Sequence, residues 1–314
     1  MASFMSAKEA AEKWDISQRR VAVLCSENRI GGAMMVGNMW IIPGDAEKPA
    51  DRRVADREKQ NAVPPKPFVK WAGGKGQLVG ELEKMLPVGE EKKLTKYVEP
   101  MVGGSALLFT VLAKYDFEQV YISDINAGLV NAYRVIKSDV DSLVARLSEM
   151  QRRFLPMDEN GRKECYYAVR ETFNRLALSE ENAVEKAALF IFLNKTCFNG
   201  LYRVNRKGQF NVPMGAYKNP CICDEDNLRN VSNALQNVEI VCGDYSLSAR
   251  VIDEKTFVYL DPPYRPISET SAFMSYNADA FDDNEQIRLA RFIDEMNKAG
   301  AKIVLSNSDP NCEP

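Results

Sequence analysis

The chain has 314 residues, a formal net charge of −3, and 45% hydrophobic and 27% charged residues. This composition is typical of a globular protein of about two domains. No apolar run reaches the roughly 18 residues of a membrane helix, and the N-terminus lacks the layout of a signal peptide, so we expect a cytoplasmic protein. Histidine is absent, which excludes Ser-His-Asp triads, Cys-His pairs and two-histidine metal sites.

The seven cysteines are scattered along the chain. They lack the spacing of a disulfide framework. No second pair stands at zinc-like spacing from Cys221 and Cys223. We therefore expect neither a disulfide framework nor a metal site.

Residues 1–48 predict a small winged helix-turn-helix unit. Ser6 and Glu9 form a capping box that begins a helix ending near Trp14, and Ser17 is expected to cap a second helix. Two short apolar strands follow, joined by a Gly-Asn turn of the kind found in tight hairpins.

This layout resembles the MerR and excisionase-like modules. The resemblance implies that the second helix is a recognition helix, and that Arg19 and Arg20 at its start contact DNA. A helical hairpin that binds protein is the alternative.

Residues 49–66 are charged, end in a proline-rich run and contain almost no large apolar side chains, which predicts a linker. Strand and helix patterns alternate beyond it, and this order predicts an α/β, Rossmann-like sheet. The predicted strands are residues 96–100, 119–124, 238–241, 256–260 and 302–305.

A long interruption separates the second predicted strand from the third. Helical patterns run from residue 140 to about 193, and a hairpin-like stretch continues to residue 223. We therefore predict an α/β domain of residues 67–140 and 235–314, with a mainly helical insertion of residues 141–234.

A glycine-rich turn predicts a site for a nucleoside-bearing cofactor. In EPMVGGS, Glu99 ends a strand, and Gly103 lets the backbone approach a ligand. Asp124 ends the next strand, where a carboxylate can accept hydrogen bonds from both ribose hydroxyls; an N-cap role is the alternative. A phosphate-binding P-loop is rejected, because Gly76 follows Lys75 where serine or threonine is required.

The segment Asp261-Pro262-Pro263-Tyr264 directly follows an apolar strand. The exocyclic amine of adenine is a poor nucleophile because its lone pair is delocalised into the ring. The Asp261 carboxylate and the Pro262 carbonyl can each accept one of its N–H bonds, and the two prolines hold that geometry. Tyr264 offers a face for stacking. Methyl transfer from a sulfonium then depends mainly on positioning; a proline-rich turn without chemistry is the alternative.

A basic stretch lies within the predicted insertion. Between Lys186 and Cys223 there are six basic residues and no acidic one, which indicates contact with a polyanion. A solvated basic loop is the alternative. Arg203, Arg206 and Lys207 concentrate the charge around a predicted hairpin.

The motifs KWAGGK, EPMVGGS, SDIN, LNKTCFNGLYRVNRKGQFNVPMGAYKNP and DPPY occur in this order between residues 67 and 309. In residues and order they resemble the Dam-like (alpha-class, D12-type) DNA adenine-N6 methyltransferases. The resemblance implies S-adenosyl-L-methionine as methyl donor, double-stranded DNA as partner, a GATC-like site, and a target adenine that is flipped out of the helix.

The resemblance also implies roles for individual residues. The cofactor contacts are expected at Trp71, Lys75, Glu99, Gly103, Asp124, Asp244 and Asp261. Asp244 would lie near the adenine of the cofactor, and Asp261, Pro262, Pro263 and Tyr264 would form the catalytic segment. DNA contacts are expected at Phe198, Arg203, Asn205, Arg206 and Lys207, with Phe198 inserting into the duplex.

Two departures from the family pattern are visible. Ser105 stands where the family commonly has glycine, and a small residue is expected to be tolerated there unless its φ is positive. The family also continues with closing strands beyond SNSDPNCEP, so these C-terminal strands are expected to be missing.

Other readings remain. Pro220-Cys221 could suggest a cytosine-C5 methyltransferase, but it lies in the insertion and not after the catalytic strand. An RNA or protein-amine methyltransferase could share the DPPY segment. The runner-up is a DNA-binding regulator with a truncated, inactive methyltransferase domain. A monomer is expected, and a restriction-modification, phage or epigenetic role stays open.

Overall fold

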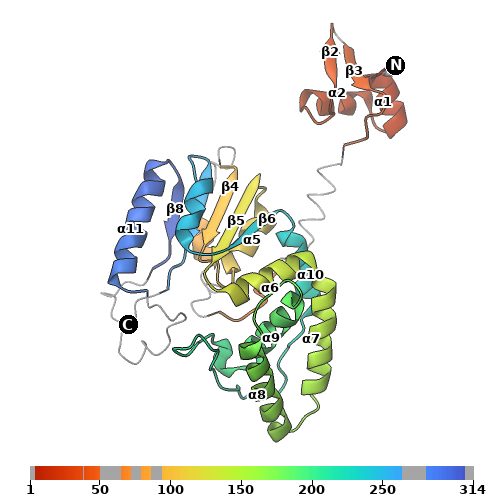
Figure 1. The fold of residues 1–314 in the computed structure, drawn as a ribbon. Coiled ribbons are helices and arrows are strands. Elements are labelled where there is room, and N and C mark those ends of the chain that lie inside the picture. Colours follow the sequence, from red (N-terminus) through yellow and green to blue (C-terminus); the bar gives the residue numbers. More distant parts are fainter. Residues whose placement is uncertain are drawn as a thin grey trace. The chain divides into compact units, whose positions relative to one another are not determined.

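A computed structural model describes residues 4–37, 39–49, 65–71, 79–85, 94–263 and 281–307. The chain divides into two compact units, residues 1–62 and 63–314, and Figure 1 shows their elements. Lys75 and Tyr264 lie outside the described residues.

In the first unit, two short helices pack against a three-stranded antiparallel sheet formed by described residues. The elements are β1 (Phe4–Ser6), α1 (Ala7–Trp14), α2 (Gln18–Ser26), β2 (Met34–Val36) and β3 (Met39–Pro43). The predicted capping box of Ser6 and the predicted cap of Ser17 are both confirmed. Val36 pairs with Met39, as the two-residue turn predicts. β1, which pairs with β3, was not expected.

The outer surface of this unit carries apolar side chains. Met34, Met35, Val36 and Met39, on β2 and at the start of β3, are each more than half exposed. The core lies on the other side of the module and is built around Trp14, together with Ala10, Val21, Leu24 and Ile42.

The described part of the second unit contains a five-stranded parallel sheet of order β6-β5-β4-β7-β8. The strands are β4 (Lys96–Pro100), β5 (Gln119–Asp124), β6 (Val238–Cys242), β7 (Thr256–Leu260) and β8 (Lys302–Leu305). All five predicted strands are therefore confirmed to within one residue. The sheet is consistent with the expected Rossmann-like fold.

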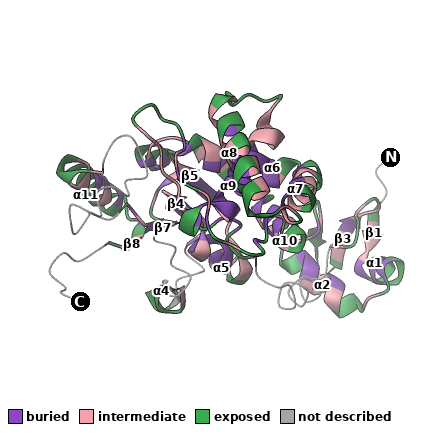
Figure 2. Ribbon diagram, turned by 90° about the horizontal axis from the view of Figure 1, so that it is seen from below, coloured by how far each residue is buried: buried purple, intermediate pink, exposed green. Residues whose placement is uncertain are grey.

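The central strands are covered on both faces, so they read as apolar runs and not as alternating ones. Every residue of β7 is buried. Figure 2 shows β4, β5 and β7 buried among helices whose outer sides are exposed. Among the residues that the structure describes, Glu99 is the one buried residue with an ionisable acidic or basic side chain other than tyrosine or cysteine, at 3% exposure.

Helices follow the strands and fill the interval between β5 and β6. They are α4 (Val79–Met85), α5 (Ala106–Lys114), α6 (Ala127–Ser138), α7 (Val140–Phe154), α8 (Glu159–Arg175), α9 (Ala183–Thr196), α10 (Glu225–Leu235) and α11 (Asp283–Lys298), with short 3-10 turns η2 (Phe198–Gly200) and η3 (Tyr245–Val251). α9 is buried along most of its length and packs against α6, α7 and α8 (Figure 1). A helix that is apolar on all sides belongs in a core.

The strand order determines where ligands can bind. From β4 the chain proceeds through β5 to β6 on one side, then returns to β7 and β8 on the other. In open parallel sheets, the crevice outside the carboxyl ends of the strands at such a reversal is the usual ligand site. The predicted cofactor turn follows β4, and the predicted catalytic segment follows β7.

Candidate active site

The glycine turn after β4 folds back over the end of β5. The backbone N–H groups of Met101 and Val102 donate to the carbonyl of Ser123, at 2.8 and 2.9 Å. Gly103 has a φ of +48°. The hydroxyl of Tyr133 donates to the carbonyl of Gly103 at 2.9 Å and is also hydrogen-bonded with Ser105 Oγ at 2.6 Å. These bonds hold the turn against the sheet.

Serine at position 105 was expected to be tolerated unless its φ is positive, and its φ is positive. Its φ is +59°, and its side chain is buried. A left-handed backbone is disfavoured for non-glycine residues. The bond from Tyr133 is one compensation that a glycine at this position would not provide.

Trp71 packs directly on the glycine turn. A Cβ atom built on Gly103 would lie 2.8 Å from Cδ1 of the indole, and one built on Gly104 would lie 3.0 Å from Cβ of Trp71. Both distances are too short for an added methyl group, so this contact requires glycine at 103. The indole also stacks on Tyr202, with ring centroids 5.7 Å apart and planes inclined by 23°.

Asp124 lies at the carboxyl end of β5, beside the same turn. Its Oδ2 accepts a hydrogen bond from Gly103 N at 3.1 Å, and its Oδ1 accepts from Asn126 N at 2.8 Å. Burial raises the pKa of Asp124 above its ordinary value, although these backbone bonds oppose the shift. Asn126 caps α6 by accepting from Leu129 N, so the N-cap alternative for Asp124 was wrong.

Asp244 joins this group from the loop after β6. The N–H of Gly243 donates to the carbonyl of Asp124 at 3.0 Å, which ties the two loops together. Oδ1 of Asp244 accepts from Ser246 N at 3.0 Å and from the guanidinium of Arg288. Burial would raise the pKa of Asp244, but the bonds from Ser246 and Arg288 outweigh it and hold the pKa below its ordinary value.

Glu99 and Asp261 bring two carboxyl groups to the boundary between β4 and β7. Glu99 Oε2 accepts a 2.7 Å hydrogen bond from the Tyr97 hydroxyl. Burial raises the pKa of Glu99 to about 8; the Tyr97 bond opposes this shift, and the negative charge of Asp261 adds to it. Asp261 directly follows β7, which pairs with β4. Pro262 is buried and Pro263 is exposed.

The basic stretch forms a tight hairpin. Val204 pairs with Phe210, and the turn is closed from within by the side chain of Asn205, whose Oδ1 accepts from Lys207 N and Gln209 N at 2.9 and 3.0 Å. Arg206 and Lys207 are exposed at its tip.

Two further predicted DNA contacts flank this hairpin. Arg203 Nε donates to Asn211 Oδ1 at 2.8 Å, which orients the guanidinium. Phe198, at the start of η2, is 51% exposed, an unusual position for a large aromatic side chain.

Lys186 does not belong to the polyanion surface that charge counting suggested. Its ammonium donates to the backbone carbonyls of Phe173 and Leu176 and lies 3.9 Å from the centroid of the Phe173 ring. It therefore links α9 to the end of α8. The available positive charge is concentrated nearer the hairpin.

The sequence model of the D12 class N6 adenine-specific DNA methyltransferases matches residues 71–313. That span contains the glycine turn, Asp124, the basic hairpin and Asp261. The chain belongs to this family.

This D12-class methyltransferase is similar in sequence to several named proteins. It is 53% identical over 244 residues to the Type II methyltransferase M.MjaIII of Methanocaldococcus jannaschii, covering 77% of this chain and 84% of that protein. It is 36% identical over 244 residues to the DNA adenine methylase of Vibrio cholerae, covering 77% and 81%. The predicted adenine-specific DNA methyltransferase is thereby confirmed.

One relative extends further along the chain. The DNA N-6-adenine-methyltransferase of Escherichia phage P1 is 30% identical over 304 residues, which is 94% of this chain but 38% of that protein. The similarity to that phage protein thus reaches into the first unit.

The methyltransferase brings most predicted cofactor residues together. Trp71, Gly103, Asp124 and Asp244 are linked by the contacts above. Asp261 directly follows β7, the strand that pairs with β4. Sequence reasoning did not single out Asn126, Asn194 or Tyr202 as residues of this site. All three lie within the motifs that carry the family resemblance, which could have drawn attention to them. Their partners, however, include residues far away in the sequence.

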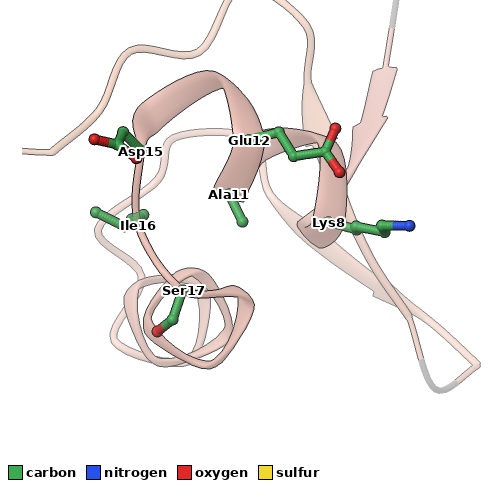
Figure 3. Close-up of a pocket in the computed structure, with 6 residues that line it drawn as sticks. All are labelled: Lys8, Ala11, Glu12, Asp15, Ile16 and Ser17. Carbon is green, nitrogen blue, oxygen red and sulfur yellow. The ribbon is translucent and has the colours of Figure 1, made fainter.

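Other parts of the described structure offer fewer features of a site. A shallow depression in the first unit is lined by Lys8, Ala11, Glu12, Asp15, Ile16 and Ser17 (Figure 3). It contains none of the predicted catalytic residues. Within the described ranges, no three Cys, Asp or Glu side chains converge to hold a metal ion. No helix there is long and apolar enough to cross a membrane.

Proposed function

We propose that this methyltransferase transfers a methyl group from S-adenosyl-L-methionine to N6 of adenine in duplex DNA, at the carboxyl ends of β4 and β7. The single observation that carries the proposal is strand pairing: β7, which leads into Asp261-Pro262, lies directly beside β4, which leads into the glycine turn. A methyl donor and a target amine would meet at this boundary.

The residues present fit the cofactor. Glycine at position 103 lets the indole of Trp71 pack against the turn, which places this aromatic face beside Asp124 at the proposed cofactor site. The carboxylates of Asp124 and Asp244 can accept hydrogen bonds from ribose hydroxyls and from an adenine amine. When bound, S-adenosylmethionine supplies a methyl group on a positively charged sulfur, and the half-buried carboxylate of Asp261 would favour such a cation. Lys75 is a further proposed contact outside the described residues.

The proposed catalytic segment acts by gripping the target amine. The carboxylate of Asp261 and the carbonyl of Pro262 each accept one N–H of the adenine, which returns electron density to the nitrogen and directs its lone pair. The Pro262-Pro263 pair restricts the backbone that presents these acceptors. Tyr264, outside the described residues, is proposed to stack on the flipped base.

The hairpin is proposed to recognise the duplex. Arg203 reads a guanine edge, since a guanidinium can bind O6 and N7 together, while Arg206 and Lys207 contact phosphates. Phe198 inserts into the stack, which offsets part of the few kcal/mol that base flipping costs. Asn205 shapes the turn. A GATC-like target is proposed from the resemblance alone.

The first unit is proposed to add a second DNA contact. Residues 1–48 would act as a winged helix-turn-helix, with Arg19 and Arg20 near the N-terminus of α2 facing the duplex. Residues 49–66 would link it to the α/β domain of residues 67–140 and 235–314, into which residues 141–234 are inserted.

The test of the proposed function is transfer of labelled methyl from S-adenosylmethionine to duplex DNA, compared with RNA and peptide acceptors. We expect Asp261→Ala to abolish transfer, because it removes one of the two acceptors of the amine, and we expect DNA binding to persist. Arg229→Ala, which removes an exposed ion-paired side chain on α10, should retain transfer. Loss of DNA binding together with transfer in Asp261→Ala, or transfer to RNA or peptide in its place, would count against the assignment.

A further inference from the structure

Tyr202 belongs to the basic segment in sequence but lies in the cofactor site in space. Its ring stacks on Trp71, and it also packs against Phe190 and Phe210, each with ring centroids 5.6 Å away. Burial raises the pKa of Tyr202; a hydrogen bond with the Asn126 side chain opposes the shift, and the charge of Asp124 adds to it. The phenol is therefore bonded to the residue that caps α6 and lies close enough to Asp124 to feel its charge.

Asn194 makes a second connection between the same two regions. Its side chain, 3% exposed, grips the backbone of Lys70 on both sides: Oδ1 accepts from Lys70 N at 2.8 Å, and Nδ2 donates to Lys70 O at 2.7 Å. Nδ2 also donates to the carbonyl of Gly200 at 3.0 Å. One buried amide thus holds the residue before Trp71 and the loop that carries Phe198.

The loop and the cofactor segment are packed too tightly to move independently. Gly200 has a φ of +65°, and a Cβ atom built on it would lie 2.4 Å from Cβ of Lys70. A movement of the Phe198 loop toward Lys70 would therefore displace Lys70, and through Trp71 the glycine turn. Tyr202 transmits the same displacement through its ring.

We propose that Tyr202 and Asn194 are positioning residues that couple occupation of the cofactor site to occupation of the DNA-recognition hairpin. The inference rests on the proposed function of both sites. A ligand at one site orders the shared elements, so the ligand at the other site meets a smaller ordering cost. By linkage, each ligand raises the affinity of the other by the same factor.

The experiment measures this factor without catalysis. The dissociation constant of S-adenosylhomocysteine, which has no methyl group to transfer, is determined for the full chain with and without a saturating GATC-containing duplex, and the reciprocal measurement is made for the duplex. We expect tighter binding in the presence of the other ligand by at least about fivefold, the lower end of typical couplings.

The variants separate coupling from folding. Asn194→Ala and Tyr202→Leu should bring the factor close to one while both ligands still bind singly. Asn131→Ala is the matched control: it removes another nearly buried amide of the same unit, which donates to Ala183 O at 2.8 Å, and it should leave the factor unchanged. Tyr202→Phe keeps the ring and loses the bond to Asn126, so it should lower the factor with little risk to folding.

An unchanged factor in Asn194→Ala and in both Tyr202 variants overturns the inference, as does a wild type that binds both ligands without coupling. An equal decrease of the coupling factor in Asn131→Ala also overturns it, because the decrease would then follow the loss of any buried amide and not of Asn194 in particular. A wild type that couples the ligands but transfers no methyl group to duplex DNA contradicts the proposed function instead.

Discussion

Glu99 shows how one residue can carry both stability and function. Its carboxyl is buried at the end of β4, bonded to Tyr97 and close to the charge of Asp261. A pKa of about 8 means that the group is largely neutral at pH 7. A neutral acid beside the proposed catalytic carboxylate leaves Asp261 as the main negative charge at that position. Binding of a cationic methyl donor would favour ionisation of Glu99 and shift this balance.

The stability of the protein should therefore fall with rising pH. Between its ordinary pKa of 4.5 and about 8, Glu99 keeps a proton in the folded state that the unfolded chain releases. The unfolding free energy should therefore decrease by about 2 to 3 kcal/mol between pH 6 and pH 8. Glu99→Gln should remove that dependence, so the variant gains stability relative to wild type as pH rises.

Urea unfolding of wild type and Glu99→Gln at pH 6 and pH 8, without cofactor, measures the effect. Glu254→Gln, at an exposed position just before β7, is the control and should track the wild type. A free-energy difference between Glu99→Gln and wild type that is equal at both pH values would show that the buried carboxyl is not held protonated.

At the scale of elements, the basic hairpin is a hydrogen-bonded turn that carries a few positive charges. Asn205 satisfies the turn amides, Gly208 adopts a φ of +72°, and Arg203 is tied to Asn211. α8 holds the segment that follows the hairpin, because the Tyr166 hydroxyl donates a hydrogen bond to Val212 O at 2.8 Å. The exposed cations Arg206 and Lys207 are thus displayed by a scaffold that does not depend on them.

Replacing Arg206 and Lys207 by alanine should weaken DNA binding through electrostatics and leave the fold intact. Each lost phosphate contact makes the slope of log K against log salt shallower by about 0.9, so the double variant should lose roughly 2 from the slope. Fluorescence anisotropy with duplex DNA over a range of salt concentrations measures it.

Arg229→Ala is the comparison for that series, because Arg229 is already paired with Asp141 and Glu225 on α10. Its slope should equal that of the wild type. An unaltered slope in the double variant would place the phosphate contacts elsewhere on the molecule.

At the scale of the whole molecule, two compact units have separate cores. Trp14, Val21 and Ile42 belong to the core of the first unit, and the two cores of the second unit are built, among the described residues, from Phe68 onward. The proposed cofactor residues all lie in the second unit. Cofactor binding should thus be independent of the first unit, while DNA affinity should depend on both.

Deleting residues 1–48 should accordingly weaken duplex binding several-fold and leave the dissociation constant of S-adenosylhomocysteine unchanged. Arg19→Ala combined with Arg20→Ala in the full chain distinguishes loss of DNA contacts from loss of the unit itself. Equal DNA affinity with and without residues 1–48 would defeat the proposed role of this unit.

Much of the fold was predictable because its signals are local. A strand such as TFVYL is recognisable from its apolar run, and the caps of Ser6 and Ser17 from residues three positions apart. The glycine turn and Asp124 were recognisable because strand ends carry such residues in this fold. β1 was missed, since three residues form it only by pairing with β3.

The sequence by itself determined the family and its reaction, because each motif is a short run whose order is characteristic; the roles of individual site residues stay predictions. Only the tertiary structure decided that Tyr202 stacks on Trp71 beside the glycine turn, that Lys186 is engaged by backbone carbonyls, and that Asn194 bonds to the backbone of Lys70. The last contact joins residues 124 positions apart. Such contacts form when the packing of helices and sheet brings remote segments together. A local sequence pattern does not predict which polar groups will be paired in this way.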